Sequence, residues 1–203
     1  MLFSAACERN KEAILAVLQD WLPPAAQVLE VGSGSGQHAV FFAQSMAGLV
    51  WQTSELNANL AGLGERIALE GGSGLAPGSQ ILMPIALDVS APGDWPDQRF
   101  DAVFTANTTH IMPASSVPDL LAGAAGVLVP GGLLLLYGPF CDHGIPTAAS
   151  NLDFDLHLRS IDPAMGVRDA VTISEQAQGL GLSPVADVAM PANNRTLVFR
   201  RNA

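Results

Sequence analysis

The chain has 203 residues, 49% of them hydrophobic, which is enough for one domain that buries about 70% of its unfolded surface. Nineteen Asp and Glu residues against nine Lys and Arg give a formal net charge of −10. An acidic surface repels polyphosphate, and no basic cluster interrupts it, so nucleic acid is excluded as the expected partner.

The start of the chain has no basic region followed by an apolar run, so a signal peptide is not expected. No apolar run reaches the ~20 residues that a bilayer-spanning helix needs. The two cysteines, Cys7 and Cys141, do not form a disulfide framework. We therefore expect a cytoplasmic protein that does not contact membranes.

Helix-like and strand-like segments alternate along the chain, which predicts an α/β fold with a largely parallel sheet. An amphipathic helix is expected at 8–22, within an N-terminal helical segment 1–25. The other expected helices are 36–47, 57–69 and 117–127, and the expected strands are 27–31, 50–54, 81–87, 100–106, 131–137, 183–190 and 196–201. We expect one domain over residues 1–203.

Two pairs of residues have the spacing of a capping box and predict helix starts: Ser116 with Asp119, and Thr172 with Glu175. Residues 139–168 have weak periodicity and many polar groups. Because long irregular segments within compact domains are often functional, we expect this segment to be a lid or substrate-binding insertion.

A glycine-rich turn, Glu30-Val-Gly-Ser-Gly-Ser-Gly36, lies between an expected strand and an expected helix. Glycine permits a tight turn and close approach of a ligand to the main chain, and the helix start offers free N–H groups. A dinucleotide fingerprint would need glycine at position 37, where glutamine stands, and the Lys of a P-loop is missing. The alternative is that the glycines serve only a turn with positive φ.

Three polar residues stand at or just beyond the ends of the following strands: Glu55, Asp88 and Asn107. Open α/β sheets bind ligands at the carboxyl ends of their strands, and an acid at such a place can accept hydrogen bonds from ribose hydroxyls. The alternatives are a solvated surface position for Glu55 and simple turn formation by Asp88.

Taken together, these residues resemble the motifs of class I S-adenosylmethionine-dependent methyltransferases. The resemblance implies that this cofactor is bound, with Glu55 on the ribose and Asp88 near the adenine amino group. The positions expected to bind it are Glu30, Gly32, Ser33, Gly34, Gly36, Glu55, Leu56, Asp88, Val89 and Asn107.

A closer resemblance covers nearly the whole chain. Its motifs are Glu8-Arg-Asn-Lys11, Gly34-Ser-Gly-Gln-His38, Asn107-Thr-Thr-His-Ile111, Tyr137-Gly-Pro-Phe140, Ser150-Asn-Leu-Asp-Phe-Asp155, Leu158-Arg-Ser-Ile-Asp-Pro163, Gly166-Val-Arg-Asp169 and Met190-Pro-Ala-Asn-Asn194. They are similar to those of the bacterial and eukaryotic family that includes methyltransferase-like protein 26. The resemblance implies a Rossmann-like, seven-stranded, mostly parallel sheet with its last strand antiparallel and helices on both faces. It implies no substrate. This chain departs from the pattern with Glu55 in place of Asp and Met165 in place of an aromatic residue.

Methyl transfer from a sulfonium requires a positioned acceptor, and a general base only where the acceptor must lose a proton. His110, three residues after Asn107, is the candidate base, and the alternative is a structural or substrate-orienting histidine. His38, in the first turn of its helix, is expected to be a packing or capping residue. The candidate substrate-binding residues are Arg9, Asn10, Tyr137, Asn151, Asp155 and Arg159.

Arg159 suits a planar carboxylate. The alternatives for the substrate-binding set are helix capping or surface ion pairs for Arg9 and Asn10, core packing for Tyr137, and a solvated charged face for the rest. The four histidines have no metal-ligand spacing, so no metal is expected.

The sequence predicts an S-adenosylmethionine-dependent methyltransferase that acts on a small molecule. Two alternatives remain open. One is a non-catalytic module that binds S-adenosylmethionine or its demethylated product, and the other is a nicotinamide-dependent oxidoreductase, against which the glutamine at position 37 argues.

Overall fold

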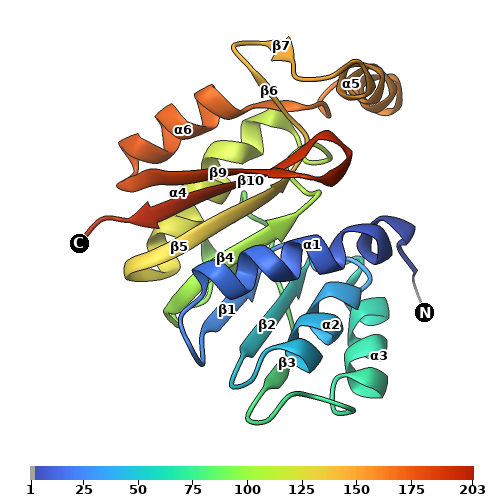
Figure 1. Ribbon diagram of the computed structural model, residues 1–203, viewed down its shortest axis with the longest axis vertical. Helices are drawn as coiled ribbons and strands as arrows, with labels where there is room; N and C mark the ends of the chain where they lie inside the picture. The colour runs from blue at the N-terminus through green and yellow to red at the C-terminus, as the bar shows by residue number, and fades with distance from the viewer. Residues whose placement is uncertain (1–2) are drawn as a thin grey trace. The chain divides into compact units, whose positions relative to one another are not determined.

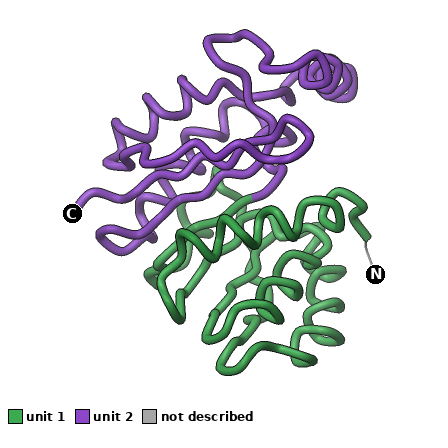
Figure 2. The backbone as a smooth tube through the Cα atoms, in the orientation of Figure 1, with its two compact units in different colours: residues 1–105 green, residues 106–203 purple. Residues whose placement is uncertain are grey.

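A computed structural model describes residues 3–203, and the chain divides into two compact units (Figure 2). Unit 1 is Met1–Thr105 and unit 2 is Ala106–Ala203. The first two residues of the expected N-terminal segment 1–25 lie outside the described residues.

Seven strands form one sheet in the order β3-β2-β1-β4-β5-β10-β9 (Figure 1). Their bounds are β1 Gln27–Glu30, β2 Val50–Glu55, β3 Gln80–Ala86, β4 Phe100–Ala106, β5 Leu128–Gly138, β9 Leu182–Met190 and β10 Asn194–Arg201. β1 pairs in parallel with β2 and β4, and β2 pairs in parallel with β3. β10 runs antiparallel to both β5 and β9. The predicted α/β fold with an antiparallel last strand is confirmed.

The core of unit 1 is aromatic. Its helices are α1 (Ala5–Trp21), α2 (Gln37–Ser45) and α3 (Leu60–Glu70), followed by the short η1 (Pro92–Asp94). Phe42 of α2 lies 5.4 Å from the Trp51 ring and 6.0 Å from the Phe104 ring, centroid to centroid, and all three side chains are fully buried. Burial of such side chains stabilises the fold by roughly 1.5–3 kcal/mol each, so this cluster fixes α2 against the strands.

Two of the family-like sequence motifs meet where α1 packs on α2. The Gln37 amide donates to the Glu8 carboxylate at 2.7 Å, and its oxygen accepts the main-chain N–H of Ser4 at 2.6 Å. His38 Nε2 lies 2.8 Å from Asn10 Oδ1. Residues of the Glu8–Lys11 and Gly34–His38 motifs therefore connect the two helices by hydrogen bonds.

Unit 2 contains the helices α4 (Val117–Val127), α5 (Ala149–Ile161) and α6 (Ala170–Gly179), with the short η2 (Ala114–Ser116) and η3 (Pro191–Asn193). It also contains a small sheet in the order β7-β6-β8, made of Ile145–Pro146, Phe140–Asp142 and Arg168–Asp169. α6 contacts α4 and β9, and α5 lies beside β7 (Figure 1).

Two expectations about unit 2 are wrong in detail. Segment 139–168 is not an irregular loop, because it carries the 13-residue α5 and two short strands. The pair Thr172 and Glu175 does not start a helix. α6 begins at Ala170, and the Asp169 carboxylate caps it by accepting the N–H groups of Val171 and Thr172. The true cap lies three residues upstream, and a short acid at that place serves as well as Ser or Thr.

None of the helices within residues 3–203 is both long enough and apolar enough to cross a membrane.

Candidate functional site

The glycine-rich turn follows β1, and its three glycines all have positive φ: 72° at Gly32, 54° at Gly34 and 75° at Gly36. They do not serve the same purpose. A Cβ atom on Gly36 would lie 2.8 Å from Leu63 Cδ1 of α3, so this glycine permits close packing. A Cβ atom on Gly34 would meet nothing within 4 Å. The main chain is therefore open to a ligand at Gly34 and closed by protein at Gly36.

Glu55, the last residue of β2, holds the open part of this turn. Its Oε2 accepts the N–H of Gly34 at 2.8 Å, and its Oε1 accepts the N–H of Leu56 at 2.9 Å. The side chain is buried, so the solvated surface position considered from the sequence does not apply. Oε1 also accepts a long hydrogen bond of 3.4 Å from the Asn59 amide. Oε2 can accept a second hydrogen bond, so Glu55 is able to accept a hydroxyl donor there.

Ser33 fastens the turn to the end of β2. Its N–H donates to the Ser54 carbonyl at 2.8 Å, and its hydroxyl accepts the Ser54 N–H at 3.1 Å. Glu30, at the end of β1, is fully buried and accepts the Trp51 Nε1–H at 2.9 Å. Burial raises the pKa of Glu30 to about 7, against the lowering effect of hydrogen bonds from Trp51 and Ser33. The turn is thus rigidly attached to two parallel strand ends.

The remaining cofactor candidates in unit 1 lie near the ends of β2 and β3. Leu56 is 48% exposed directly beside the Glu55 carboxylate, which places an uncovered apolar side chain there. Asp88 is exposed, and its carboxylate accepts the N–H of Ser90 at 2.9 Å, as in an ordinary turn. The carbonyl of Val89 accepts the Trp95 indole N–H at 3.3 Å.

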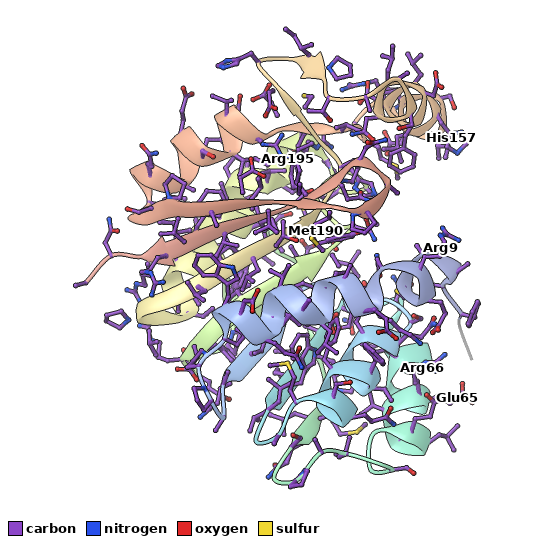
Figure 3. The ribbon with its side chains drawn as sticks, in the orientation of Figure 1. Arg9, Glu65, Arg66, His157, Met190 and Arg195 are labelled. Atoms are coloured by element: carbon purple, nitrogen blue, oxygen red, sulfur yellow. The ribbon has the colours of Figure 1, made fainter. Side chains whose placement is uncertain are left out.

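The two α1 candidates differ in their surroundings. Asn10 is buried and hydrogen-bonded to His38, whose ring stacks on Phe42 with centroids 5.3 Å apart. Burial lowers the pKa of His38 to about 4, which fits the packing function expected for it. Arg9 is exposed on α1 and makes no ion pair or hydrogen bond within residues 3–203 (Figure 3).

In unit 2, Asn107 and His110 converge on Gly138. A Cβ atom at Gly138 would lie 3.6 Å from His110 Nδ1 and 4.0 Å from Asn107 Oδ1. Asn107 has a positive φ of 59°, and its N–H donates to the Tyr137 carbonyl at 2.9 Å. His110 is 4% exposed, and its Nδ1 has no hydrogen-bond partner within the described residues. A buried polar atom without a partner is uncommon in proteins, so Nδ1 is a candidate for contact with a ligand.

Arg168 is a residue of this region that the sequence did not single out. It is buried and donates three hydrogen bonds to carbonyl oxygens: 2.9 Å to Thr109, 2.6 Å to Met112 and 2.8 Å to Ala164. Two of these carbonyls flank His110, so the cation fixes the loop that carries the histidine. Burial, with a smaller contribution from the Arg168 charge, lowers the pKa of His110 to about 4, and the ring is neutral at pH 7. The only sequence signal was the Gly166–Asp169 motif.

Three of the predicted substrate residues, Asn151, Asp155 and Arg159, line one cavity of about 270 Å³ in unit 2. They share one stripe of α5, at intervals of four residues. Tyr137 is buried in β5, and it is not among the residues that line this cavity.

Asn151 also has structural bonds. Its amide donates to Thr147 Oγ1 and to the Asn193 carbonyl, each at 3.0 Å. Asn193 and its neighbour Ala192 both have positive φ, 58° and 57°. The Ser150–Asp155 and Met190–Asn194 motifs therefore meet, and Asn151 supports a strained turn.

Within residues 3–203 no group of three or more His, Cys, Asp or Glu side chains could hold a metal ion.

A protein-family model described as "Protein of unknown function (DUF938)" matches residues 1–201, and the chain belongs to that family.

Solved structures share the fold. An O-methyltransferase family protein from Burkholderia thailandensis is 17% identical, with a TM-score of 0.78 over 98% of this chain and 58% of that one. The mitomycin 7-O-methyltransferase MmcR is 20% identical, with a TM-score of 0.77 over 97% and 54%. Human N-acetylserotonin methyltransferase, solved in complex with SAM, is 13% identical, with a TM-score of 0.76 over 98% and 53%. The chain thus spans a little over half the length of these structures, and the likeness establishes the fold.

Proposed function

We propose that this member of the DUF938 family binds S-adenosylmethionine in unit 1 and transfers its methyl group to a small molecule. The observation that carries the proposal is the open main chain at Gly34 beside the buried carboxylate of Glu55, 2.8 Å away. Other glycines of the chain, such as Gly131 and Gly181, combine a positive φ with no neighbour for a Cβ atom, so it is the buried acid beside Gly34 that supports a nucleoside ligand. An acid at the end of a neighbouring strand is the group that binds ribose hydroxyls in other open α/β sheets.

The residues of unit 1 fit the parts of this cofactor. Glu55 would accept the two ribose hydroxyls, one on Oε2 and one on Oε1 in place of the long bond from Asn59, and the exposed Leu56 would pack on the adenine. Asp88 and Val89 would bind the adenine edge. Asn107, which belongs to unit 2, remains a proposed cofactor-binding residue on the ground of the sequence motif alone. Glu30, Gly32, Ser33 and Gly36 would shape the turn that meets the amino-acid tail. When bound, the cofactor supplies an activated methyl group on a sulfonium.

The candidate acceptor-binding residues have less support. His110 would act as the general base, with its unpartnered Nδ1 taking the acceptor proton. Arg9, Asn10, Tyr137, Asn151, Asp155 and Arg159 remain the proposed substrate-binding residues. The low pKa of His110 makes it a weak base, and this favours a second candidate function, in which the protein binds S-adenosylmethionine or its demethylated product without catalysis.

The resemblance of the motifs to the family of methyltransferase-like protein 26 and the structural likeness to O-methyltransferases of 13–20% identity both agree with the proposal. Location in the cytoplasm is part of the same proposal.

Calorimetric titration with S-adenosylmethionine, S-adenosylhomocysteine and NAD tests the proposed function. We expect binding of the first two and none of NAD. Binding of NAD alone would overturn the proposal in favour of an oxidoreductase. Turnover separates the two remaining functions: after His110→Gln, an enzyme loses labelled methyl transfer while its affinity for S-adenosylmethionine stays within about twofold. A protein that binds the cofactor tightly but labels nothing in a metabolite extract is the non-catalytic module.

A further inference from the structure

The cavity of unit 2 contains an arginine whose hydrogen-bonding capacity is mostly unused. Arg159 donates from Nε to Asp155 Oδ2 at 2.8 Å. Its two terminal amino groups make no hydrogen bond within residues 3–203, and its side chain is 48% exposed. A guanidinium presents five N–H donors in a fixed plane, so four remain available.

The guanidinium is held in a defined position. Asp155 grips one edge, and its own Oδ1 accepts the Val167 N–H at 2.7 Å. Gly166, with a φ of 148°, lies against both members of this pair: a Cβ atom there would lie 2.6 Å from Arg159 Nη2 and 2.7 Å from Asp155 Oδ1. Only glycine lets the main chain come so close to the ion pair. The free N–H groups of the Arg159 guanidinium are therefore already oriented in the absence of a ligand.

Asp169, the second acid that lines the cavity, already uses both carboxylate oxygens as hydrogen-bond acceptors. Asp169 Oδ1 accepts two N–H groups, from Val171 and Thr172. Its Oδ2 accepts the Gly144 N–H and lies 3.8 Å from Cys141 Sγ. Burial acts to raise the pKa of Asp169, but these main-chain bonds outweigh it and keep the pKa below its ordinary value. Asp169 is thus a structural anion, and Arg159 is the residue with donors to offer.

We propose that this cavity is a binding site for small organic carboxylates, held by the terminal amino groups of Arg159. A planar carboxylate matches the two parallel N–H directions of a guanidinium. A phosphate would bring up to two negative charges close to Asp155 and Asp169, on a chain whose net charge is already −10, so a monoanion fits better. Pro146 and Val167 supply an apolar wall for the remainder of the ligand.

This site borders the loop that carries His110, because Gly166, which lies against the Arg159 guanidinium, donates its N–H to the His110 carbonyl at 2.9 Å. Asn151, Asp155 and Arg159 lie on one flank of α5, whereas Phe154 on the other flank contacts His110, with ring centroids 5.2 Å apart. The buried Leu158 separates the two flanks. All the residues that line the cavity belong to unit 2, so the carboxylate site stands whether or not unit 1 binds S-adenosylmethionine. An extension rests on the proposed function: the methyl acceptor is then a small organic acid.

The test uses three pairs of probes that differ in charge and little in shape: acetate and acetamide, benzoate and benzamide, N-acetylglycine and N-acetylglycinamide. Binding is followed in the isotope-labelled full chain by NMR shifts of the Gly166 and Val167 amides and of Arg159 Nε–H. We expect at least one acid to bind at this site at least tenfold more tightly than its amide. Arg159→Gln should weaken that acid by about tenfold to a hundredfold, and Arg159→Lys should restore part of the loss.

Arg200→Gln is the charge-matched control, because Arg200 is an exposed arginine of the same unit outside the cavity. We expect it to leave acid binding within about twofold. The inference is overturned if no acid shifts these signals, if acids and amides bind equally, or if the two Gln variants weaken binding equally.

The extension is measured separately, by labelled methyl incorporation into the acidic fraction of a metabolite extract. Arg159→Gln should reduce it at least tenfold with unchanged affinity for S-adenosylmethionine. Unchanged incorporation overturns the extension alone. Failure of the wild-type chain to bind the cofactor overturns the proposed function and the extension with it, and leaves the carboxylate site to be judged by the binding experiment.

Discussion

Two loops of this protein carry its candidate chemistry, and they are built in different ways. The turn at Gly32–Gly36 is held by main-chain hydrogen bonds and the Glu55 carboxylate, and it leaves Gly34 open. The loop at 107–112 is held by a buried cation, Arg168, and it encloses His110. The first exposes its main chain to a ligand, while the second buries one side chain with an unpartnered nitrogen. If both loops serve the proposed function, the difference implies that the proposed nucleoside site is preformed and that the proposed acceptor site depends on side-chain positions.

The largest expected effect is on stability, and it should differ between Gly36 and Gly34 of the first loop. Gly36→Ala should lower the free energy of unfolding by about 3–5 kcal/mol, because it adds backbone strain at positive φ to a clash with Leu63. Gly34→Ala adds the strain alone, about 1–2 kcal/mol, but should abolish most binding of S-adenosylmethionine. Urea unfolding and calorimetry measure both. Equal destabilisation by the two substitutions would refute the distinction between an open and a packed glycine.

The next effect concerns the buried acid under the first loop. The pKa of Glu30 is raised to about 7 in the folded protein, against an ordinary value of 4.5. Between these two values Glu30 is more protonated in the folded state than in the unfolded state, so its contribution to the free energy of unfolding falls as pH rises, by roughly 3 kcal/mol in total.

Glu30→Gln should remove this contribution while keeping an acceptor for Trp51. The buried His38 and His110, whose pKa values are lowered to about 4, make the stability rise with pH in the same window, and this affects both proteins equally. Denaturant titrations of both proteins at several pH values therefore measure the difference in their free energies of unfolding. A difference that stays constant between pH 4.5 and 7 would contradict the raised pKa of Glu30.

The third prediction concerns the affinity of the first loop for a ligand and tests the carboxylate of Glu55. Glu55→Ala should weaken S-adenosylmethionine by about tenfold to a hundredfold, equivalent to roughly 1.5–3 kcal/mol, because hydrogen bonds to a charged acceptor are lost. Calorimetry gives the dissociation constant, and Glu65→Ala, an exposed acid of α3, is the matched control (Figure 3). An unchanged constant would place the ribose elsewhere.

The smallest effect probes the second loop. Replacing the buried cation in Arg168→Gln should raise the pKa of His110 from about 4, because the repulsion between Arg168 and the imidazolium is removed. The new value should stay below the ordinary 6.5, since burial is the larger cause. NMR titration of the His110 ring protons measures it. A pKa that is unchanged in a folded variant would show that Arg168 acts on His110 through hydrogen bonds alone.

The sequence predicted the first loop better than the second for a physical reason. Alternating glycines between apolar segments, with an acid ending the next strand, are local patterns that report backbone conformation directly. The motif at Gly166–Asp169 gave no such signal, because Arg168 acts on carbonyls 56 and 59 residues away. The sequence did not predict the helix α5 because this helix buries only Asn151 and Leu158, and its apolar residues from Leu152 to Leu158 alternate with a period of two instead of the period of a helix. The cavity beside Arg159 depends on Gly166, which no periodicity reveals.

The central claim is that the open turn at Gly34 and the carboxylate of Glu55 together hold the nucleoside and the amino-acid tail of S-adenosylmethionine. A crystal structure of the full chain with S-adenosylhomocysteine tests it most directly. The account predicts both ribose hydroxyls within hydrogen-bond distance of Glu55 and the ligand's tail against the main chain of Gly34. A ligand bound elsewhere, with Gly34 still facing solvent, would contradict it.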